Sequence, residues 1–156
     1  MTSDYGSCQC GRTRFSHQGV PLVRFYCHCL ICQSFYRQPF ADVTMGHTSN
    51  LSILDIENVE FRQHRPPPAL QRGACRHCGF PVASFLRSVP FVRVASVPSM
   101  NFPDQSRLPE PGFHIFYHRR VADIDDELPK YSGYWKSEWV AGKRVIAALM
   151  HGQRRA

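Results

Sequence analysis

Seven cysteines, in a chain of 156 residues, are the residues whose type and spacing could support chemistry. They occur in three groups: Cys8-Gln9-Cys10-Gly11, Cys27-His28-Cys29-Leu30-Ile31-Cys32 and Cys75-Arg76-His77-Cys78-Gly79. Thiolates separated by one or two residues are typical ligands of zinc and other soft metals. An odd number of cysteines does not suit a disulfide framework, so the pattern predicts metal or redox chemistry.

The first and third groups predict a closed metal site. The sulfur atoms around a tetrahedral zinc lie about 3.8 Å apart, a geometry that two closely spaced pairs meet when they face each other. Residues i and i+2 of a regular strand are about 6.6 Å apart, so Cys8 and Cys10 must lie where the chain bends, and the glycine after each pair supplies that freedom. The predicted structural zinc ligands are Cys8, Cys10, Cys75 and Cys78, here called the four-cysteine cluster. The alternatives are a redox pair and small buried residues.

The middle group, here called the three-cysteine cluster, consists of Cys27, Cys29 and Cys32 and has no further cysteine to complete it. This is the layout of a catalytic metal that keeps a fourth position for water or substrate. Three thiolates leave a zinc centre anionic and a poor activator of water, so a soft sulfur ligand suits it better than hydrolysis does. The alternatives are a second structural zinc, completed by a His or Asp, and a reactive dithiol. The pattern favours the open site, with a thiol as the substrate.

Two histidines lie inside the cysteine groups. Because the neighbours of His28 and His77 are already predicted ligands, we expect these rings to orient the loop or to hydrogen-bond a thiolate. The acidic run at 123–127 is interpreted as a solvated turn, with pairing to arginines as the alternative.

Composition and charge limit the class of protein. Hydrophobic residues make up 43% and charged residues 20% of the chain, which excludes a disordered protein and predicts one folded domain. No apolar run approaches the ~18 residues of a membrane span, and the first residues lack the layout of a signal peptide, so we expect a cytoplasmic protein. The net charge of +7 is compatible with binding to a polyanion such as nucleic acid. The arginines are scattered, however, which disfavours nucleic acid and favours a small anionic ligand.

The elements that must position the cysteines are mainly strands. Short runs rich in β-branched and aromatic residues, broken by Gly, Pro and Asn, predict a sheet-rich fold of short antiparallel strands held by the zinc site. The predicted strands are Leu22–Cys27, Leu51–Leu54, Val59–Gln63, Pro81–Leu86, Phe91–Ser96 and Phe113–His118.

The C-terminal end changes to a helical period. Its larger apolar residues recur at spacings of four and three, which predicts one stripe of an α-helix. The stripe consists of Trp135, Trp139, Gly142, Ile146 and Leu149. We expect the stripe to pack the two tryptophans against the sheet; the alternative is a lid over the site or a contact between subunits.

Taken with His114-Ile115-Phe116 and Asp126-Glu127-Leu128-Pro129-Lys130-Tyr131, the three cysteine groups resemble the glutathione-dependent formaldehyde-activating enzyme (GFA) family, which shares its domain with centromere protein V. The order and spacing match over about 6–131. We therefore predict a GFA-like zinc domain at 4–131 and a helical extension at 132–156 that packs on it.

The resemblance implies a largely β fold, a closed zinc at the four-cysteine cluster and a second zinc at the three-cysteine cluster. It also implies a carbon–sulfur lyase that reversibly joins formaldehyde to the thiol of glutathione as S-(hydroxymethyl)glutathione. His114 is the candidate for proton transfer because of its place in the family motif. The chain departs from the family after Cys32, where the segment 33–40 is aromatic and contains one Arg and no Gly. We expect this segment to border the open metal and to make the pocket apolar.

Two other functions stay open on the sequence. The charge and the kinship with centromere protein V allow a non-enzymatic zinc module that binds nucleic acid or a protein. The closely spaced Cys29 and Cys32 allow thiol redox chemistry or metal storage. A homo-oligomer formed through the C-terminal helix is a further prediction.

Overall fold

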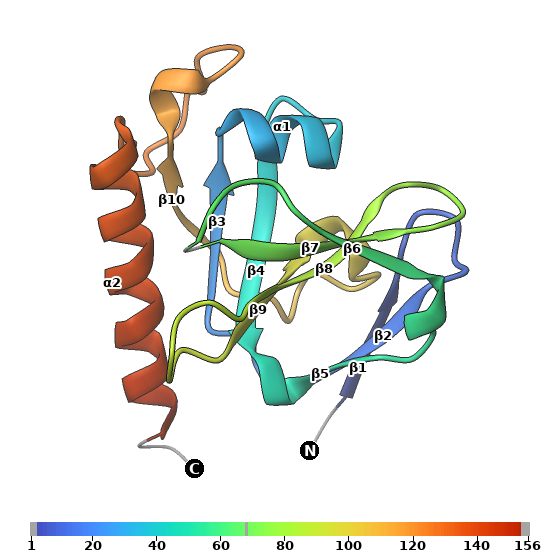
Figure 1. Cartoon of the computed structure of the whole chain (residues 1–156). Helices are drawn as coiled ribbons and strands as arrows, with labels where there is room; N and C mark the ends of the chain where they lie inside the picture. The colour runs from blue at the N-terminus through green and yellow to red at the C-terminus, as the bar shows by residue number, and fades with distance from the viewer. Residues whose placement is uncertain (1–2, 68, 154–156) are drawn as a thin grey trace.

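The computed structural model describes residues 3–67 and 69–153, and these residues form a mainly β fold (Figure 1). The strands are β1 (Ser3–Ser7), β2 (Arg14–Gln18), β3 (Val23–Cys27), β4 (Ala41–His47), β5 (Leu51–Ile53), β6 (Val59–Gln63), β7 (Leu70–Cys75), β8 (Pro81–Leu86), β9 (Val94–Pro98) and β10 (Pro111–Ile115). The α-helices are α1 (Leu30–Tyr36) and α2 (Tyr134–Gln153). None of the helices in the described ranges is long and apolar enough to cross a membrane.

The strands form two sheets. A small sheet has the order β1-β2-β5, and a larger one has the order β10-β3-β4-β9-β8-β7-β6. The pairing is antiparallel, as predicted, except between β10 and β3, which run parallel. That parallel pair places Ile115 beside Cys27, so the end of β10 lies against the start of the three-cysteine cluster.

The predicted strand bounds agree best with the structure where a β-branched or aromatic pattern is bounded by a turn. β6 and β8 have the predicted bounds, whereas the strand predicted at Phe91–Ser96 begins only at Val94, because Phe91 adopts a positive φ of 65°. The strand predicted at Phe113–His118 ends at Ile115 because Phe116 is left-handed, with a φ of 54°. Strands β1, β2, β4 and β7 were not predicted, because their sequences mix polar residues and glycine with apolar ones.

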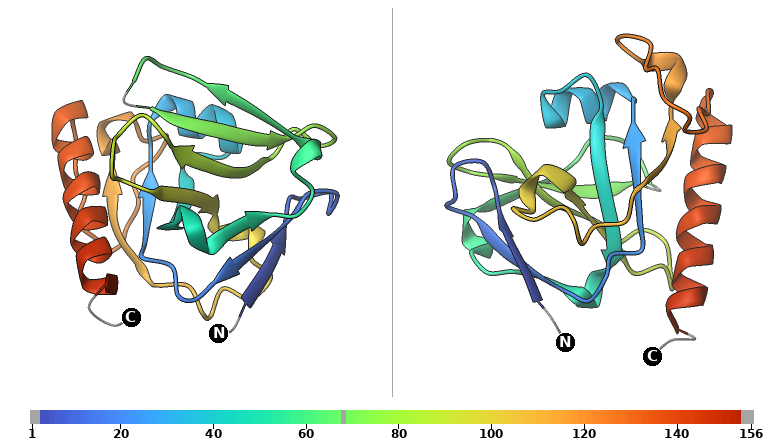
Figure 2. Two further views of the ribbon diagram at one scale, coloured as in Figure 1. Left: turned by 60° about the horizontal axis from the view of Figure 1, so that its bottom comes forward. Right: turned by 180° about the vertical axis from the view of Figure 1, so that it is seen from behind.

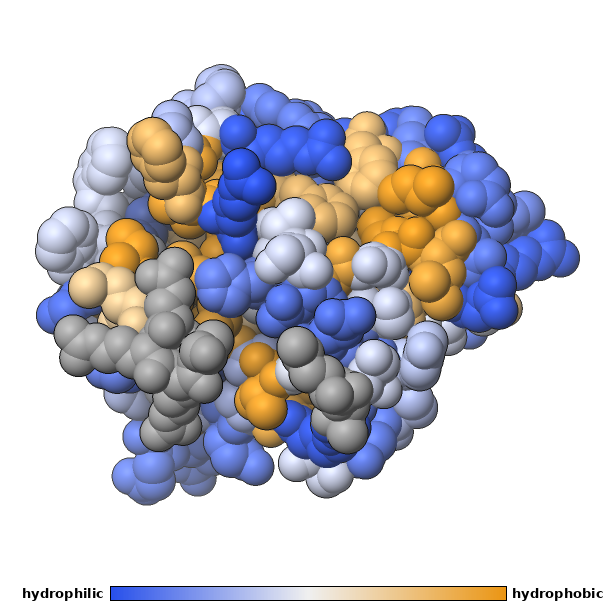
Figure 3. All heavy atoms as spheres, turned by 90° about the horizontal axis from the view of Figure 1, so that it is seen from below, coloured by the Kyte–Doolittle hydropathy of each residue, from blue (hydrophilic) through white to orange (hydrophobic). Residues whose placement is uncertain are grey.

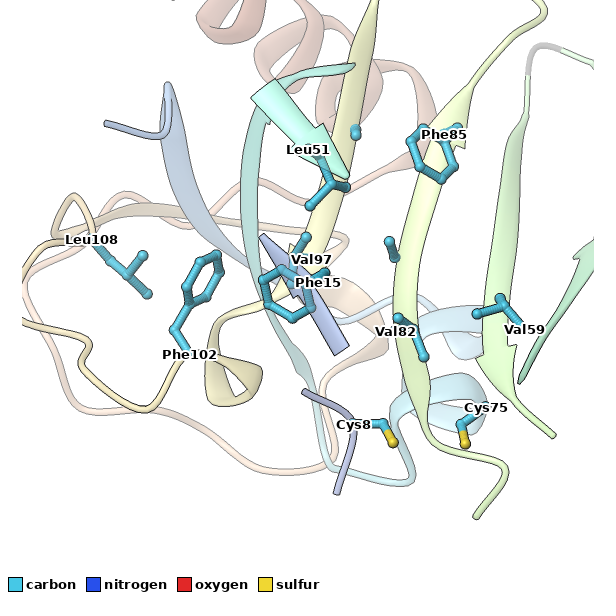
Figure 4. Close-up of a cluster of buried hydrophobic side chains, with 12 residues drawn as sticks. Cys8, Phe15, Leu51, Val59, Cys75, Val82, Phe85, Val97, Phe102 and Leu108 are labelled. Atoms are coloured by element: carbon cyan, nitrogen blue, oxygen red, sulfur yellow. The ribbon is translucent and has the colours of Figure 1, made fainter. Parts of the chain in front are cut away.

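Two hydrophobic clusters fill the interior; the first contains part of the four-cysteine cluster and the second contains part of the three-cysteine cluster. The first is built around Phe15, Val82 and Phe102, and it includes Cys8 and Cys75. Figure 4 shows these two cysteines together at one edge of that cluster. The second cluster contains Cys27 and Cys32 together with Phe25, Phe113 and residues of α2. Both cysteine groups are therefore held by packed apolar side chains.

Helix α2 packs along β10 and β3, on the side of the molecule away from the small sheet (Figures 1 and 2). Its buried positions are Ser137 and Val145, with Ala141 partly buried between them. These small side chains recur every four residues and let the helix approach the sheet closely. The backbone N–H of Phe116 donates a hydrogen bond of 2.8 Å to the Ser137 hydroxyl, which fixes this face toward the sheet.

The expectation that the tryptophans pack on the sheet is wrong. Trp135 is 82% exposed and Trp139 is 72% exposed, and Ile146 is half exposed. Of the predicted stripe, only Leu149 packs partly against the core. Hydrophobic side chains also reach the surface between polar ones in the view from below (Figure 3). The helix therefore has small residues on its buried face and large aromatic residues in solvent.

Replacing Val145 with Ala should lower the free energy of unfolding by about 1–3 kcal/mol, because a buried side chain that joins α2 to the sheet is truncated. Trp139→Ala is the matched control on the opposite face, and in dilute, monomeric protein it should change the free energy of unfolding by less than about 0.5 kcal/mol. Urea titrations followed by circular dichroism measure both. A larger loss for Trp139→Ala than for Val145→Ala would contradict the assignment of the buried face.

Candidate metal centres and the adjoining cavity

The four-cysteine cluster meets the geometry of a tetrahedral metal site. Its four sulfur atoms all lie within 4.8 Å of one another. The Sγ atoms of Cys8 and Cys10 are 3.5 Å apart, and those of Cys10 and Cys75 are 3.8 Å apart. One of these distances equals, and the other lies slightly below, the separation of about 3.8 Å that zinc imposes on its thiolates. The donor set therefore fits zinc with no position left open.

Two tight turns bring these sulfur atoms together. The turn after β1 has Gly11 in the left-handed region, and its N–H donates to the carbonyl of Cys8 at 3.0 Å. The turn after β7 has Gly79 in the same region, and its N–H donates to the carbonyl of Cys75 at 2.8 Å. The backbone N–H of Thr13 also points at the Cys8 sulfur, at 3.4 Å. Both glycines thus act as predicted.

The three-cysteine cluster forms where β3 passes into α1. Cys27 ends the strand, Cys29 is the N-cap of the helix and Cys32 lies in its first turn. The N–H of Cys32 donates to the Cys29 sulfur at 3.3 Å, so the sulfur caps the helix. The three Sγ atoms lie within 4.8 Å of one another. No histidine or carboxylate in residues 3–67 and 69–153 joins this group, which disfavours a second closed site.

The environment of this cluster stabilises a thiolate. Hydrogen bonds from Cys27 and Cys32 lower the pKa of the Cys29 thiol, and the backbone of Cys32 and the charge of Arg72 act in the same direction. A metal ligand must be deprotonated, so these contacts prepare Cys29 to bind a cation.

A cavity of about 520 Å³ opens beside the three-cysteine cluster, and all three of its cysteines line it. Its walls are mostly aliphatic and aromatic side chains from β3, β4, β8, β9, β10 and α2. They include Phe25, Val43, Met45, Leu86, Val94, Ile115 and Val145. The open side of the cluster therefore faces an apolar space large enough for a small molecule.

The segment 33–40 contributes less to this cavity than expected. Of its residues only Tyr36 lines the cavity. The Phe40 ring packs against Tyr26 and His28, and the Gln33 side chain donates to the carbonyl of His28 at 2.6 Å. The cavity is apolar, as predicted, but because of strand and α2 residues rather than this segment.

A buried chain of hydrogen bonds runs away from the cluster. His28 Nε2 and His114 Nδ1 are 2.9 Å apart, and His114 Nε2 lies 2.8 Å from Asp126 Oδ2. Burial, with His114 and the charge of Arg120 nearby, lowers the pKa of His28 to about 4, so its ring is neutral at pH 7. Hydrogen bonds from Lys130 and His114 lower the pKa of Asp126 to about 2. The chain orients His28, and with it the loop between Cys27 and Cys29.

This placement bears on two expectations. Asp126, expected in a solvated turn, instead anchors a buried histidine pair. His114 is fully buried, has both ring nitrogens hydrogen-bonded and is absent from the cavity lining. Its role in proton transfer stays a prediction, and the contacts also support a positioning role.

His77 lies on the surface side of the four-cysteine cluster, where its Nδ1 is 2.9 Å from the Arg12 guanidinium.

The sequence profile of the family described as glutathione-dependent formaldehyde-activating enzyme (GFA) matches residues 3–119. The chain belongs to this family. The matched region of the GFA profile contains both cysteine clusters and His114, and it ends before Asp126 and α2. Among solved structures, a crystal structure of a Rhodobacter sphaeroides protein superposes with a TM-score of 0.53, at 18% identity, over 82% of this chain and 99% of that one, which supports the fold alone. No curated protein matches the chain.

Asp126→Asn should lower the free energy of unfolding of this GFA member by about 1–3 kcal/mol, because the buried His114 loses a charged hydrogen-bond partner. Asp123→Asn serves as the control, because its side chain is 82% exposed and pairs with Arg120 at the surface. That variant should shift stability by less than about 0.5 kcal/mol. Equal effects of the two substitutions in urea titrations would show that the histidine chain does not depend on Asp126.

Proposed function

We propose that this GFA member is a zinc-dependent carbon–sulfur lyase that acts on a thiol–aldehyde adduct such as S-(hydroxymethyl)glutathione. One observation carries the proposal: three cysteine sulfurs, without a fourth protein ligand among the described residues, line an apolar cavity. Family membership supports the reaction class, since the family is described by glutathione and formaldehyde.

The two clusters have different tasks in this proposal. The four-cysteine cluster would hold a structural zinc, and the three-cysteine cluster would hold a second zinc with one position free for substrate. When bound there, zinc lowers the proton affinity of a thiol and orients its sulfur. The N–H of Cys32, which donates to the Cys29 sulfur, and the buried His28 keep the loop in the ligating conformation.

The cavity supplies the setting for the reaction. In the joining direction the thiol gives up its proton and its sulfur forms a bond to the aldehyde carbon, while the electron pair of the carbonyl π bond moves to the oxygen, which takes up a proton. In the reverse direction the hydroxyl loses its proton, the carbon–oxygen π bond forms again, the carbon–sulfur bond breaks with its electron pair on sulfur, and the sulfur regains a proton. Apolar walls hold the two partners together and limit the access of water. Residues of α2, among them Val145, form one wall, so the helix encloses the cavity from one side.

Two further properties belong to the proposal. A cytoplasmic location agrees with the composition, and pairing of subunits through α2 is supported by the exposed Trp135 and Trp139. Both stay predictions.

Zinc content tests the division of the cysteines. The wild-type protein should bind two zinc ions per chain, and Cys29→Ser should bind one and keep its fold, because only the open site is lost. Cys75→Ser should lose zinc and unfold at a lower temperature, because its cluster joins distant parts of the chain. Metal analysis with thermal melts measures both. Unfolding of Cys29→Ser would instead favour two structural zincs.

Activity tests the reaction itself. Exchange between formaldehyde, a thiol and their adduct, followed by NMR, should be faster with the wild-type protein than without it. Cys29→Ser should lose this acceleration, whereas Trp139→Ala, on the exposed face of α2, should retain it. If the wild-type protein gives no acceleration with glutathione or with simpler thiols, the lyase proposal is wrong and a non-enzymatic zinc module gains support.

A further inference from the structure

Arg72 on β7 lines the same cavity as the three-cysteine cluster, and its side chain has no hydrogen-bonded partner there. It is only 8% exposed, and its Nη1 atom is shielded from solvent and without a hydrogen bond. Within residues 3–67 and 69–153 no carboxylate forms an ion pair with it. Arginine is almost never buried in this way without an anion, because a desolvated charge must be compensated.

Two other arginines line the cavity: Arg119 is exposed, and Arg65 is paired with a carboxylate. Arg65 donates to Glu138 at 3.0 Å and also to the hydroxyl of Tyr134, and its guanidinium lies over the Tyr134 ring. These contacts tie the strand side of the cavity to α2. The thiolates of the three-cysteine cluster are the negative charges near Arg72, but no carboxylate of the described residues pairs with it and its Nη1 makes no hydrogen bond.

The cysteines do not use the donors of Arg72. No hydrogen bond joins its guanidinium to a sulfur of the described residues. Its charge still acts through space: besides the hydrogen bonds from Cys27 and Cys32, it lowers the pKa of Cys29. Arg72 is thus close enough to the cluster to influence the pKa of Cys29, while the N–H donors of its planar guanidinium make no hydrogen bond to a sulfur. Such a fork matches a carboxylate, which it binds through two parallel hydrogen bonds.

We propose that Arg72 determines substrate specificity by binding the carboxylate of the thiol whose sulfur lies at the three-cysteine cluster. This inference rests on the proposed reaction, and within it replaces glutathione, which carries several charged groups, by thiols with one carboxylate at the end of an apolar body. Among the arginines that line the cavity, Arg72 is the buried one without a carboxylate partner, whereas Arg119 is exposed, and the walls are mainly aliphatic and aromatic. A thiol with several charged groups would leave some of them unpaired in that space.

The test compares 6-mercaptohexanoate with 6-mercaptohexan-1-ol, which share a chain and differ in the terminal group. Isothermal titration of the zinc-loaded protein should show that the acid binds about 10-fold or more tightly than the alcohol, as expected for a charge-assisted hydrogen bond. Arg72→Met should remove this preference and leave the affinity for the alcohol unchanged. Arg62→Met is the matched control and should keep the preference, because Arg62 pairs with Glu60 at the surface and does not line the cavity.

Three results would overturn the proposal. The first is equal affinity of the wild-type protein for acid and alcohol. The second is an equal loss of affinity for both in Arg72→Met, which would mean that Arg72 acts only on the metal centre. The third is tighter binding of glutathione than of 6-mercaptohexanoate. If Arg72→Met does not fold, Arg72→Lys replaces it and should keep the charge but reduce the preference.

The titration contains no aldehyde and is therefore independent of lyase activity. A carboxylate preference in a protein without lyase activity would leave the role of Arg72 standing and refute the proposed function. Lyase activity without a carboxylate preference would support the proposed function and refute the role of Arg72.

Discussion

The meeting of two cysteine pairs from distant parts of the chain is the constraint on which the rest of the structure depends. Cys8 follows the first strand of the small sheet, and Cys75 ends β7 of the large sheet, so their contact joins the two sheets. The hydrophobic cluster that contains both cysteines extends from this contact (Figure 4). A metal held here would replace many weaker contacts between the sheets, which a chain of this size needs for a stable arrangement.

Strand β7 links this contact to the cavity. It carries Arg72 and Cys75 three residues apart, and alternation along a strand sends such residues to opposite faces. The register of β7 against β8 shifts between Gly73 and Ala74, directly between the two. The strand that is fixed at one end by the four-cysteine cluster therefore presents a buried guanidinium to the other cluster. The cavity-lining Arg72 and a cysteine of the four-cysteine cluster therefore belong to the same strand.

The sequence predicted the cysteine groups well because metal ligation depends on residue type and short spacing. The turns at Gly11 and Gly79 followed from the same local geometry. Strand β8 followed from its apolar run, and β6 from the β-branched Val59 and the aromatic Phe61, which alternate with polar residues. These features are local, and local features can be inferred without knowledge of the fold.

Features that depend on contacts between distant segments could not be predicted in this way. The stripe of Trp135 and Trp139 has a helical period, but small residues of α2 pack better against β10, so the stripe faces solvent. Asp126 belongs to an acidic run, and the sequence around it does not indicate its partner; the fold brings it beside His114. Arg72 was one of many scattered arginines, and only its burial beside the cavity distinguishes it.

The central claim is that the chain has one closed and one open metal site. The most direct test is ¹¹³Cd NMR of the protein in which cadmium replaces the bound metal, before and after addition of a thiol. The account predicts two resonances, of which one stays unchanged and the other shifts when the thiol enters the open position. A single resonance, or two resonances whose chemical shifts both stay unchanged when the thiol is added, would contradict the central claim.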